Sequence, residues 1–474
     1  MTEHKISMIL SLPNAAIVAP AGHGKTEMIV DLVEHTSGKQ LLLTHTNAGV
    51  DALEKRLKKR NISKARYNIS TIAAFCIRWC MSYNKSAEID MSLSPLNGKQ
   101  KSSNYYEQIY KGAKRIFTLN WAGNVLKASY TGIIVDEYQD CTQDQHEIIL
   151  AMNQFLPVRV LGDPLQGIFS FAGNLVNWSN LAFQRIEVET KPWRWMKTKP
   201  ILGDYLTAIR AELTPALSGQ SCNFHLDFCQ GGISIINPEE LDIYNLLREL
   251  KKYSTVVYIT KWEAQQGQFC KRLSGVFQYD EKQDCEILYD SAKYFDENKD
   301  FDLALAVIGF VSKCATNVNA ELQSYISNLK ANKNNFSRIK KHANFGHLIN
   351  SVCIDGTHSA IINTLKWFES QDAFKFYRKE LYLEMLRSLR YANEKNTTVF
   401  EAANHIRKDS NLQKRYNHFK FLASRTLLSK GLEFDCVIID MSDPLSARDF
   451  YVALTRAQKK IYIISNSADF SLTN

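Results

Sequence analysis

The sequence predicts an α/β protein built on two parallel sheets, each interrupted by a mostly helical insertion. Short apolar runs typical of buried strands alternate with amphipathic segments in two separate stretches of the chain, and this alternation is typical of parallel sheets. Within each stretch a longer polar, helical segment separates the strands. At 474 residues the chain is also too long for one hydrophobic core, so we expect two to four domains.

The first stretch begins close to the N-terminus. Its pattern predicts strands at residues 15–19, 41–44, 132–135 and 158–161, with helices at 25–35, 48–59 and 143–152. Between residues 76 and 129 the pattern becomes polar and mostly helical, which indicates a small insertion. The second stretch predicts strands at 233–236, 255–260, 436–440 and 461–465, interrupted by a helical region from about 301 to 418.

These patterns give expected domain boundaries. The first sheet domain is expected at 1–75 plus 130–190, with its helical insertion at 76–129. The second sheet domain is expected at 191–310 plus 416–474, with its helical insertion at 311–415.

Composition places limits on the class of protein. Apolar residues make up 45% and charged residues 23%, which is ordinary for a globular protein. No apolar run approaches the ~20 residues that a bilayer requires, and residues 1–12 lack a cleavable signal pattern. We therefore expect a cytoplasmic protein with no membrane partner. Ten cysteines are scattered singly and favour reduced thiols over a zinc site or disulfides.

Charge points to a polyanionic partner without establishing one. Lys plus Arg number 58 against 49 Asp plus Glu, a formal charge of +9. The stretch at 330–347, KANKNNFSRIKKHANFGH, is strongly basic. Two interpretations stay open for it, a solvated helix face or loop and a nucleic-acid contact.

A glycine-rich loop follows the first predicted strand. The segment APAGHGKT lies between that strand and a predicted helix, and glycines at 22 and 24 let main-chain N–H groups surround phosphates. Lys25 would reach the β- and γ-phosphates, and the Thr26 hydroxyl would bind Mg²⁺. The sequence therefore predicts a nucleoside triphosphate site.

Two carboxylates end a later buried strand, in GIIVDEYQD. Asp136 at the tip of this strand can hold Mg²⁺, directly or through water. Glu137 is placed to orient and deprotonate an attacking water. A structural acidic turn would explain the two carboxylates alone, but not the phosphate loop upstream of them.

The segments DEYQD and VRVLGDPLQGIFSFAG resemble the signature of the UvrD, Rep and PcrA-type helicases of superfamily 1. Five further segments resemble that family's motifs in the family's order: LLLTHTNAGVDAL, ISTIAAFC, KPWRW, LLSKGLEFD and YVALTRA. The resemblance implies two RecA-like motor domains, ATP and Mg²⁺ as cofactors, and single-stranded or partly duplex DNA as partner.

The resemblance also implies roles for individual residues. Gln166 would sense the γ-phosphate, and Arg194 and Arg456 would act as arginine fingers. Trp193 would lie against the adenine ring, and Glu433 would contact the ribose. The complete set expected around the nucleotide is Ala21, Gly22, His23, Gly24, Lys25, Thr26, Glu27, Trp193, Gly431 and Glu433. A surface salt bridge is the alternative for either arginine taken alone.

Other positions match the family's nucleic-acid track. Thr46 and Asn47 match positions that contact the backbone, and His45 stands where the family often has phenylalanine. Phe169 and Phe171 fall where stacking aromatics are expected, because flat side chains bind single strands with little sequence preference. Two phenylalanines at this spacing could also face a core.

Two functions are consistent with these features. The first is an ATP-dependent DNA helicase or translocase moving on single-stranded DNA, with 3′-to-5′ polarity implied by the family. The second is a DNA-sensing ATPase subunit that activates a separate nuclease partner and unwinds little alone. Compact UvrD-like proteins of anti-phage systems such as Gabija resemble this second class, and the short insertions are consistent with it.

Overall fold

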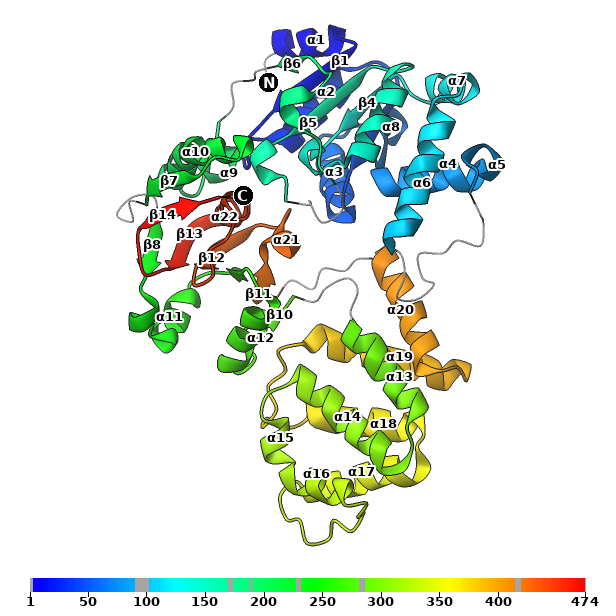
Figure 1. Ribbon diagram of the computed structural model, residues 1–474, viewed down its shortest axis with the longest axis vertical. Coiled ribbons are helices and arrows are strands. Elements are labelled where there is room, and N and C mark those ends of the chain that lie inside the picture. The colour runs from blue at the N-terminus through cyan, green and yellow to red at the C-terminus, as the bar shows by residue number, and fades with distance from the viewer. Residues whose placement is uncertain are drawn as a thin grey trace. The chain divides into compact units, whose positions relative to one another are not determined.

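The computed structural model describes residues 3–89, 102–168, 174–186, 188, 191–226, 232–280, 286–413 and 419–473 (Figure 1). The chain divides into two compact units. The first unit comprises Met1–Asp242 with Ser429–Asn474, and the second comprises Ile243–Leu428. Within the described ranges, no helix combines the length and apolar character needed to cross a bilayer.

The first unit contains a six-stranded sheet in the order β3-β2-β4-β5-β1-β6, and its strands are parallel. The strands are β1 (Asn14–Val18), β2 (Gln40–Thr44), β3 (Tyr67–Thr71), β4 (Gly132–Val135), β5 (Val158–Gly162) and β6 (Arg185–Ile186). Every residue of β2, β4 and β5 is buried, as expected for parallel strands that are covered on both faces.

Helices cover both faces of this sheet. Alternate strand residues point to opposite faces, so Leu42 and Ile134 pack on one side while Leu41 and Ile133 pack on the other. The first face is covered by α1 (Glu3–Ser11), α2 (Lys25–His35) and α3 (Asn47–Lys59). The second face is covered by α4 (Ile72–Ser82), α6 (Ser102–Phe117), α7 (Asn120–Ser129) and α8 (Gln143–Asn153).

A second six-stranded parallel sheet has the order β10-β11-β9-β12-β13-β8. Its strands are β8 (Ile233–Ile236), β9 (Val256–Thr260), β10 (Gln278–Tyr279), β11 (Phe421–Arg425), β12 (Phe434–Asp440) and β13 (Ala457–Ile464). A small antiparallel pair joins β7 (Cys222–His225) to β14 (Asp469–Leu472). The protein is thus α/β with two parallel sheets of the RecA-like kind, and the predicted fold class is confirmed.

The described part of the first unit contains four further α-helices. They are α5 (Asn84–Ala87), α9 (Trp193–Met196), α10 (Pro200–Leu213) and α22 (Ala447–Leu454). In the second unit, α11 (Ile243–Leu250) and α12 (Glu263–Arg272) precede a run of helices, and α21 (Thr426–Ser429) follows β11.

This run of helices shares one apolar core. Its members are α13 (Glu286–Glu297), α14 (Asp300–Cys314), α15 (Val318–Glu321), α16 (Gln323–Lys330), α17 (Ala343–Asp355), α18 (His358–Glu369), α19 (Lys379–Lys395) and α20 (Val399–Gln413). The run begins at Glu286, earlier than the expected residue 301, because α13 contributes Leu288, Ala292 and Phe295 to the same core. The finer domain boundaries stay predictions.

Candidate active site

The glycine-rich loop lies between β1 and α2, as the sequence predicted. Gly22 and Gly24 have φ values of 71° and 86°, in the left-handed region that glycine adopts without strain. A Cβ on Gly22 would lie only 2.6 Å from Cζ3 of Trp195, so the loop also needs glycine for space. The first turn of α2 leaves main-chain N–H groups without intrahelical partners, which suits an anion.

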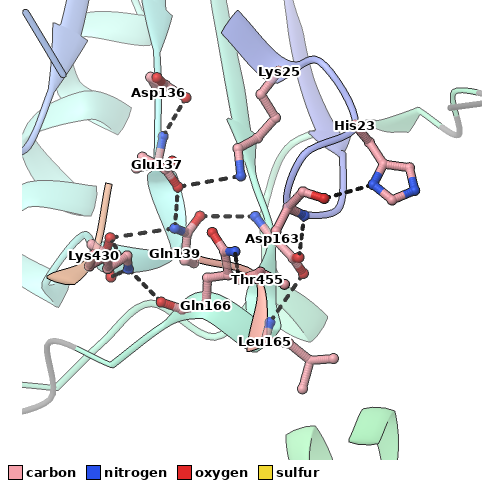
Figure 2. A network of polar contacts seen from close by, with 12 residues as sticks. His23, Lys25, Asp136, Glu137, Gln139, Asp163, Leu165, Gln166, Lys430 and Thr455 are labelled. Carbon is pink, nitrogen blue, oxygen red and sulfur yellow. Dashed lines mark hydrogen bonds and ion pairs between the residues drawn. The ribbon is translucent and has the colours of Figure 1, made fainter. Parts of the chain in front are cut away.

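Lys25 is the first residue of α2 and is only 9% exposed. Its Nζ lies 3.5 Å from Oε2 of Glu137, which follows β4 in the sheet (Figure 2). Glu137 has φ of 52°, an unusual conformation for a residue other than glycine. Such conformations cost about 1–3 kcal/mol and are frequent at active sites.

The pKa values of the two carboxylates after β4 are shifted in opposite directions. Burial, and then the negative charge of Glu137, raises the pKa of Asp136 to about 7. Burial alone would raise the pKa of Glu137 as well, but the positive charges of Lys25 and Lys430 lower it to about 2. Glu137 is therefore the carboxylate that stays ionised beside the lysine.

A buried carboxylate of the next loop connects the phosphate loop to several other elements. Asp163 follows β5, is fully buried, and accepts a hydrogen bond from the main-chain N–H of Ala21 at 3.1 Å. The hydroxyl of Tyr451 donates to the same carboxylate at 3.0 Å, and Arg210 forms an ion pair with it at 2.8 Å. Gln139 accepts from the Asp163 N–H at 2.9 Å and donates to Glu137 (Figure 2).

A buried ion pair lies on the other side of Glu137. Lys430 binds both carboxylate oxygens of Asp140, at 2.6 and 2.5 Å, and donates to the carbonyl of Gln166 (Figure 2). The lysine and aspartate side chains are 8% and 2% exposed. The Gln166 side chain in turn lies 3.4 Å from the Thr455 hydroxyl. Five residues therefore extend the site beyond the sequence prediction: Gln139, Asp163, Arg210, Lys430 and Tyr451.

Both predicted arginines lie in the same unit as the phosphate loop. The main-chain N–H of Arg194 donates to the Gly22 carbonyl at 3.1 Å. Its guanidinium donates to the Thr455 carbonyl and pairs with Glu433 at 2.6 Å. Arg456 is 3% exposed and donates to the carbonyls of Val452 and Leu432 at 3.0 and 3.2 Å. Burial, and then the charge of Arg194, lowers the pKa of Arg456 to about 10, so it remains cationic at neutral pH.

The other residues expected around the nucleotide differ in their surroundings. Trp193 is 58% exposed, yet its Cδ1 lies 3.1 Å from where a Cβ on Gly24 would stand, so its indole borders the loop. His23 is buried, with Nδ1 2.8 Å from the Ala21 carbonyl. Thr26 is half-buried, whereas Glu27 is ion-paired with Arg56. Gly431 is exposed and has φ of 83°.

The structure describes three of the five residues that were predicted to contact nucleic acid. Thr46 caps α3, since its hydroxyl accepts from the Gly49 N–H at 3.0 Å, and Asn47 is the exposed first residue of that helix. His45 lies 3.4 Å from Sγ of Cys141, and burial, with the charge of Lys430, lowers its pKa to about 4. Phe169 and Phe171 lie outside the described residues.

The donor set fits a triphosphate with Mg²⁺. Lys25 and the main-chain N–H groups of the loop suit phosphate oxygens, and Asp136 with the Thr26 hydroxyl would supply two oxygen ligands. Mg²⁺ usually takes one or two protein oxygens and completes its shell with phosphate and water. Elsewhere in the described ranges, no group of three or more His, Cys, Asp or Glu residues forms an alternative metal cluster.

Comparison with known protein families gives two matches. Residues 2–172 match an AAA domain family, and residues 423–464 match the UvrD-like helicase C-terminal domain. No curated protein matches the sequence.

Solved structures similar to the chain include two viral helicases and a fungal one. An arterivirus nonstructural protein 10 helicase with DNA has 9% identity and a TM-score of 0.33, over 96% of this chain and 61% of that one. The PRRSV helicase has 9% identity and a TM-score of 0.35, over 97% and 54%. The Pif1 helicase from Candida albicans has 10% identity and a TM-score of 0.40, over 98% and 94%.

The chain therefore spans less than two thirds of the two viral helicases. The two matched family models lie at the two ends of the chain, and both coincide with the motifs that surround Lys25 and Arg456. The chain is thus similar to AAA domains in its N-terminal part and to the C-terminal domain of UvrD-like helicases near its C-terminus.

Proposed function

We propose that this protein is an ATP-dependent DNA helicase or translocase that moves 3′ to 5′ on single-stranded DNA. The observation that carries the proposal is the juxtaposition of Lys25 and Glu137, 3.5 Å apart, at the end of a parallel sheet. Ligands of open α/β sheets bind at the carboxyl ends of the strands. The match to a UvrD-like helicase domain and the basic charge of the chain support DNA as the partner.

In this proposal each residue of the site has its own role in binding or hydrolysing ATP. Lys25 and the loop N–H groups bind the phosphates, and Asp136 with Thr26 holds Mg²⁺, which would neutralise charge on the phosphate oxygens. Glu137 accepts the proton of the attacking water. Trp193 stacks against adenine, and Glu433 contacts the ribose. Gln166 senses the γ-phosphate.

Arg194 and Arg456 provide positive charge where it develops on the transferred phosphoryl group. Arg194 is paired with Glu433, so closure on a nucleotide would require the guanidinium to exchange this carboxylate for phosphate oxygens. The main chain of Arg194 is already anchored to Gly22. A short side-chain rotation can therefore change the guanidinium's partner without moving its backbone.

The test combines ATP hydrolysis with strand displacement. We expect single-stranded DNA to stimulate hydrolysis, and duplexes with a 3′ overhang to be unwound in preference to those with a 5′ overhang. The Lys25→Ala variant serves as the inactive control. Absence of ATP hydrolysis by the wild-type chain would reject the proposed motor function. A preference for duplexes with a 5′ overhang would reject the proposed 3′-to-5′ polarity.

Stimulated hydrolysis without displacement would instead favour the DNA-sensing ATPase subunit. In the part of the chain that the structure describes, the insertion of the first sheet domain is formed by α4 to α7 alone. Little surface is then available there for separating a duplex. The addition of a candidate nuclease partner to the ATPase would decide between the two functions.

A further inference from the structure

Asp163, directly after β5, is fully buried and accepts hydrogen bonds from three segments of the candidate site. Its Oδ2 accepts the main-chain N–H of Ala21, at the beginning of the phosphate loop, at 3.1 Å. Its Oδ1 accepts the N–H of Leu165 at 3.3 Å and so caps the short 3₁₀ helix Pro164–Gln166 (Figure 2). The hydroxyl of Tyr451 donates to Oδ2 at 3.0 Å. One carboxylate therefore holds three segments of the site together.

Each of these segments leads to a residue that has a role in the proposed function. Lys25 directly follows the phosphate loop, and Gln166 ends the 3₁₀ helix. Tyr451 belongs to α22, and Arg456 follows two residues after that helix ends. The position of Asp163 therefore influences how these groups lie relative to one another.

The charge of Asp163 is balanced by an arginine of α10. A carboxylate this deeply buried needs a cationic partner, because its desolvation is otherwise uncompensated. Nη2 of Arg210 lies 2.8 Å from Oδ1, and Nε lies 3.5 Å from Oδ2. Within the part of the chain that the structure describes, no other cationic side chain forms an ion pair with Asp163. The planar guanidinium contacts both oxygens, so it orients the carboxylate as well as neutralising it.

The same helix contacts the phosphate loop at a second point. The hydroxyl of Thr207, one turn before Arg210, lies 3.5 Å from Nε2 of His23. Nδ1 of His23 in turn lies 2.8 Å from the Ala21 carbonyl. Residues three apart on a helix lie on one face. The face of α10 that carries Thr207 and Arg210 is therefore directed toward the phosphate loop.

We infer that Arg210 is a positioning residue for ATP hydrolysis, which acts through Asp163 to hold the phosphate loop, Gln166 and α22 in the arrangement that the transition state requires. Arg210 lies outside every segment of the chain that resembles a helicase motif. The inference rests on the proposed function, because it concerns the same hydrolysis reaction.

The inference makes kcat the quantity that changes in an Arg210→Met variant. Methionine keeps much of the apolar stem but removes the charge, so Asp163 loses its counter-ion. The substitution removes no phosphate ligand, because Lys25 and the loop N–H groups are retained, and ATP binding in the ground state is therefore largely kept. We expect kcat to fall by ~10-fold to ~10²-fold while KM for ATP changes by less than ~3-fold, the result of misplaced groups that act in the transition state.

Arg407→Met is the matched control for loss of a buried ion pair. Arg407 pairs with Glu384 at 3.2 Å in the second unit, and the two side chains are 12% and 6% exposed. Both arginine variants should be less stable than the wild type in urea unfolding, because each leaves a carboxylate without its partner. Only Arg210→Met should lower kcat. A purely structural role of Arg210 would instead leave the folded fraction with wild-type kcat.

Tyr451→Phe tests whether the effect passes through Asp163. This substitution removes the other side-chain donor to the carboxylate and should also lower kcat. Residues that act as a unit have non-additive effects. The double variant Arg210→Met, Tyr451→Phe should therefore lose at least ~3-fold less kcat than the product of the two single losses. Arg407→Met combined with Tyr451→Phe should show only the loss of Tyr451→Phe.

Steady-state ATP hydrolysis by the full chain, with saturating single-stranded DNA, gives kcat and KM for every variant. Wild-type kcat in Arg210→Met, an equal loss in Arg407→Met, or a rise in KM with kcat unchanged would overturn the inference. A double variant at the product of the single losses would overturn it too. Arg210→Gln, which keeps a hydrogen-bond donor for Asp163, replaces Arg210→Met if that variant does not fold, and the same change in kcat is expected of it. Failure of the proposed function is distinguishable, because the wild-type chain itself would then not hydrolyse ATP.

Discussion

Nζ of Lys430 lies 2.6 Å from Oδ1 of Asp140, although the two residues are 290 positions apart in sequence. Both side chains are almost fully buried. Breaking a buried ion pair by removing one partner costs about 3–5 kcal/mol, because the other charge is left unpaired in the interior. The pair therefore joins the segment after β4 to the segment before β12.

The Lys430→Met variant should lower the free energy of unfolding by ~3 kcal/mol or more. The double variant Lys430→Met, Asp140→Asn should lose less than the single one, because no charge is left alone. Urea unfolding of both measures the difference. Lys111→Met, which breaks an exposed pair with Glu107, should cost under ~1 kcal/mol. A double variant less stable than Lys430→Met would contradict this account.

Substitutions at two glycines with similar backbone conformations can distinguish the cost of backbone strain from the cost of steric crowding. Gly22 and Gly219 have φ of 71° and 74°, but a Cβ would meet Trp195 at Gly22 and nothing within 4 Å at Gly219. Gly219→Ala should cost only ~1 kcal/mol in the free energy of unfolding, from the left-handed conformation. Gly22→Ala should cost more and also abolish ATP hydrolysis. Equal effects of the two substitutions would show that crowding by Trp195 is unimportant.

His45 should make stability depend on pH. Burial lowers its pKa from 6.5 to about 4 in the folded chain. As pH falls, the unfolded chain therefore takes up this proton first, and stability is lost between pH 6.5 and about 4. His45→Phe should reduce this loss by at most ~3 kcal/mol. Urea unfolding across this pH range measures the loss, with the exposed-site variant His4→Phe as control. Identical pH profiles for His45→Phe and wild type would exclude this role.

Glu137→Gln should reduce ATP hydrolysis by ~10²–10⁴-fold, the usual contribution of a general base. The amide keeps the shape of the side chain, and nucleotide affinity should therefore fall little. Steady-state hydrolysis and binding of a fluorescent ATP analogue measure the two effects. Glu107→Gln, on the exposed face of α6, is a matched control that should hydrolyse ATP at the wild-type rate. Wild-type turnover in Glu137→Gln would assign the base to another residue.

The sequence predicted best the strands that coincide with short apolar runs. The apolar runs of β4 and β8 were predicted with their observed bounds, Gly132–Val135 and Ile233–Ile236. By contrast, β3 (YNIST) and β11 (FLASR) were not predicted, because each contains polar residues beside its apolar ones and forms no clear apolar run. Their strand conformation depends on pairing with β2 and β9 rather than on their own composition.

Prediction of the site from the sequence was limited in a similar way. Lys25 and Glu137 could each be predicted, because each lies in a contiguous motif whose spacing along a strand or loop indicates its chemistry. The partners of Asp163 could not, because Arg210 and Tyr451 are 47 and 288 positions away. One signal was present, since Asp163 and Tyr451 both lie inside segments that resemble helicase motifs.

The contact between Lys25 and Glu137 has a consequence for the timing of proton transfer. One ammonium group cannot fully neutralise both a carboxylate and an incoming polyphosphate. An anion that draws Lys25 toward itself would remove from Glu137 the largest of the positive charges that lower its pKa. Glu137 would then become a stronger base only once the nucleotide is bound. In the absence of nucleotide, it would therefore be a poor base for activating water.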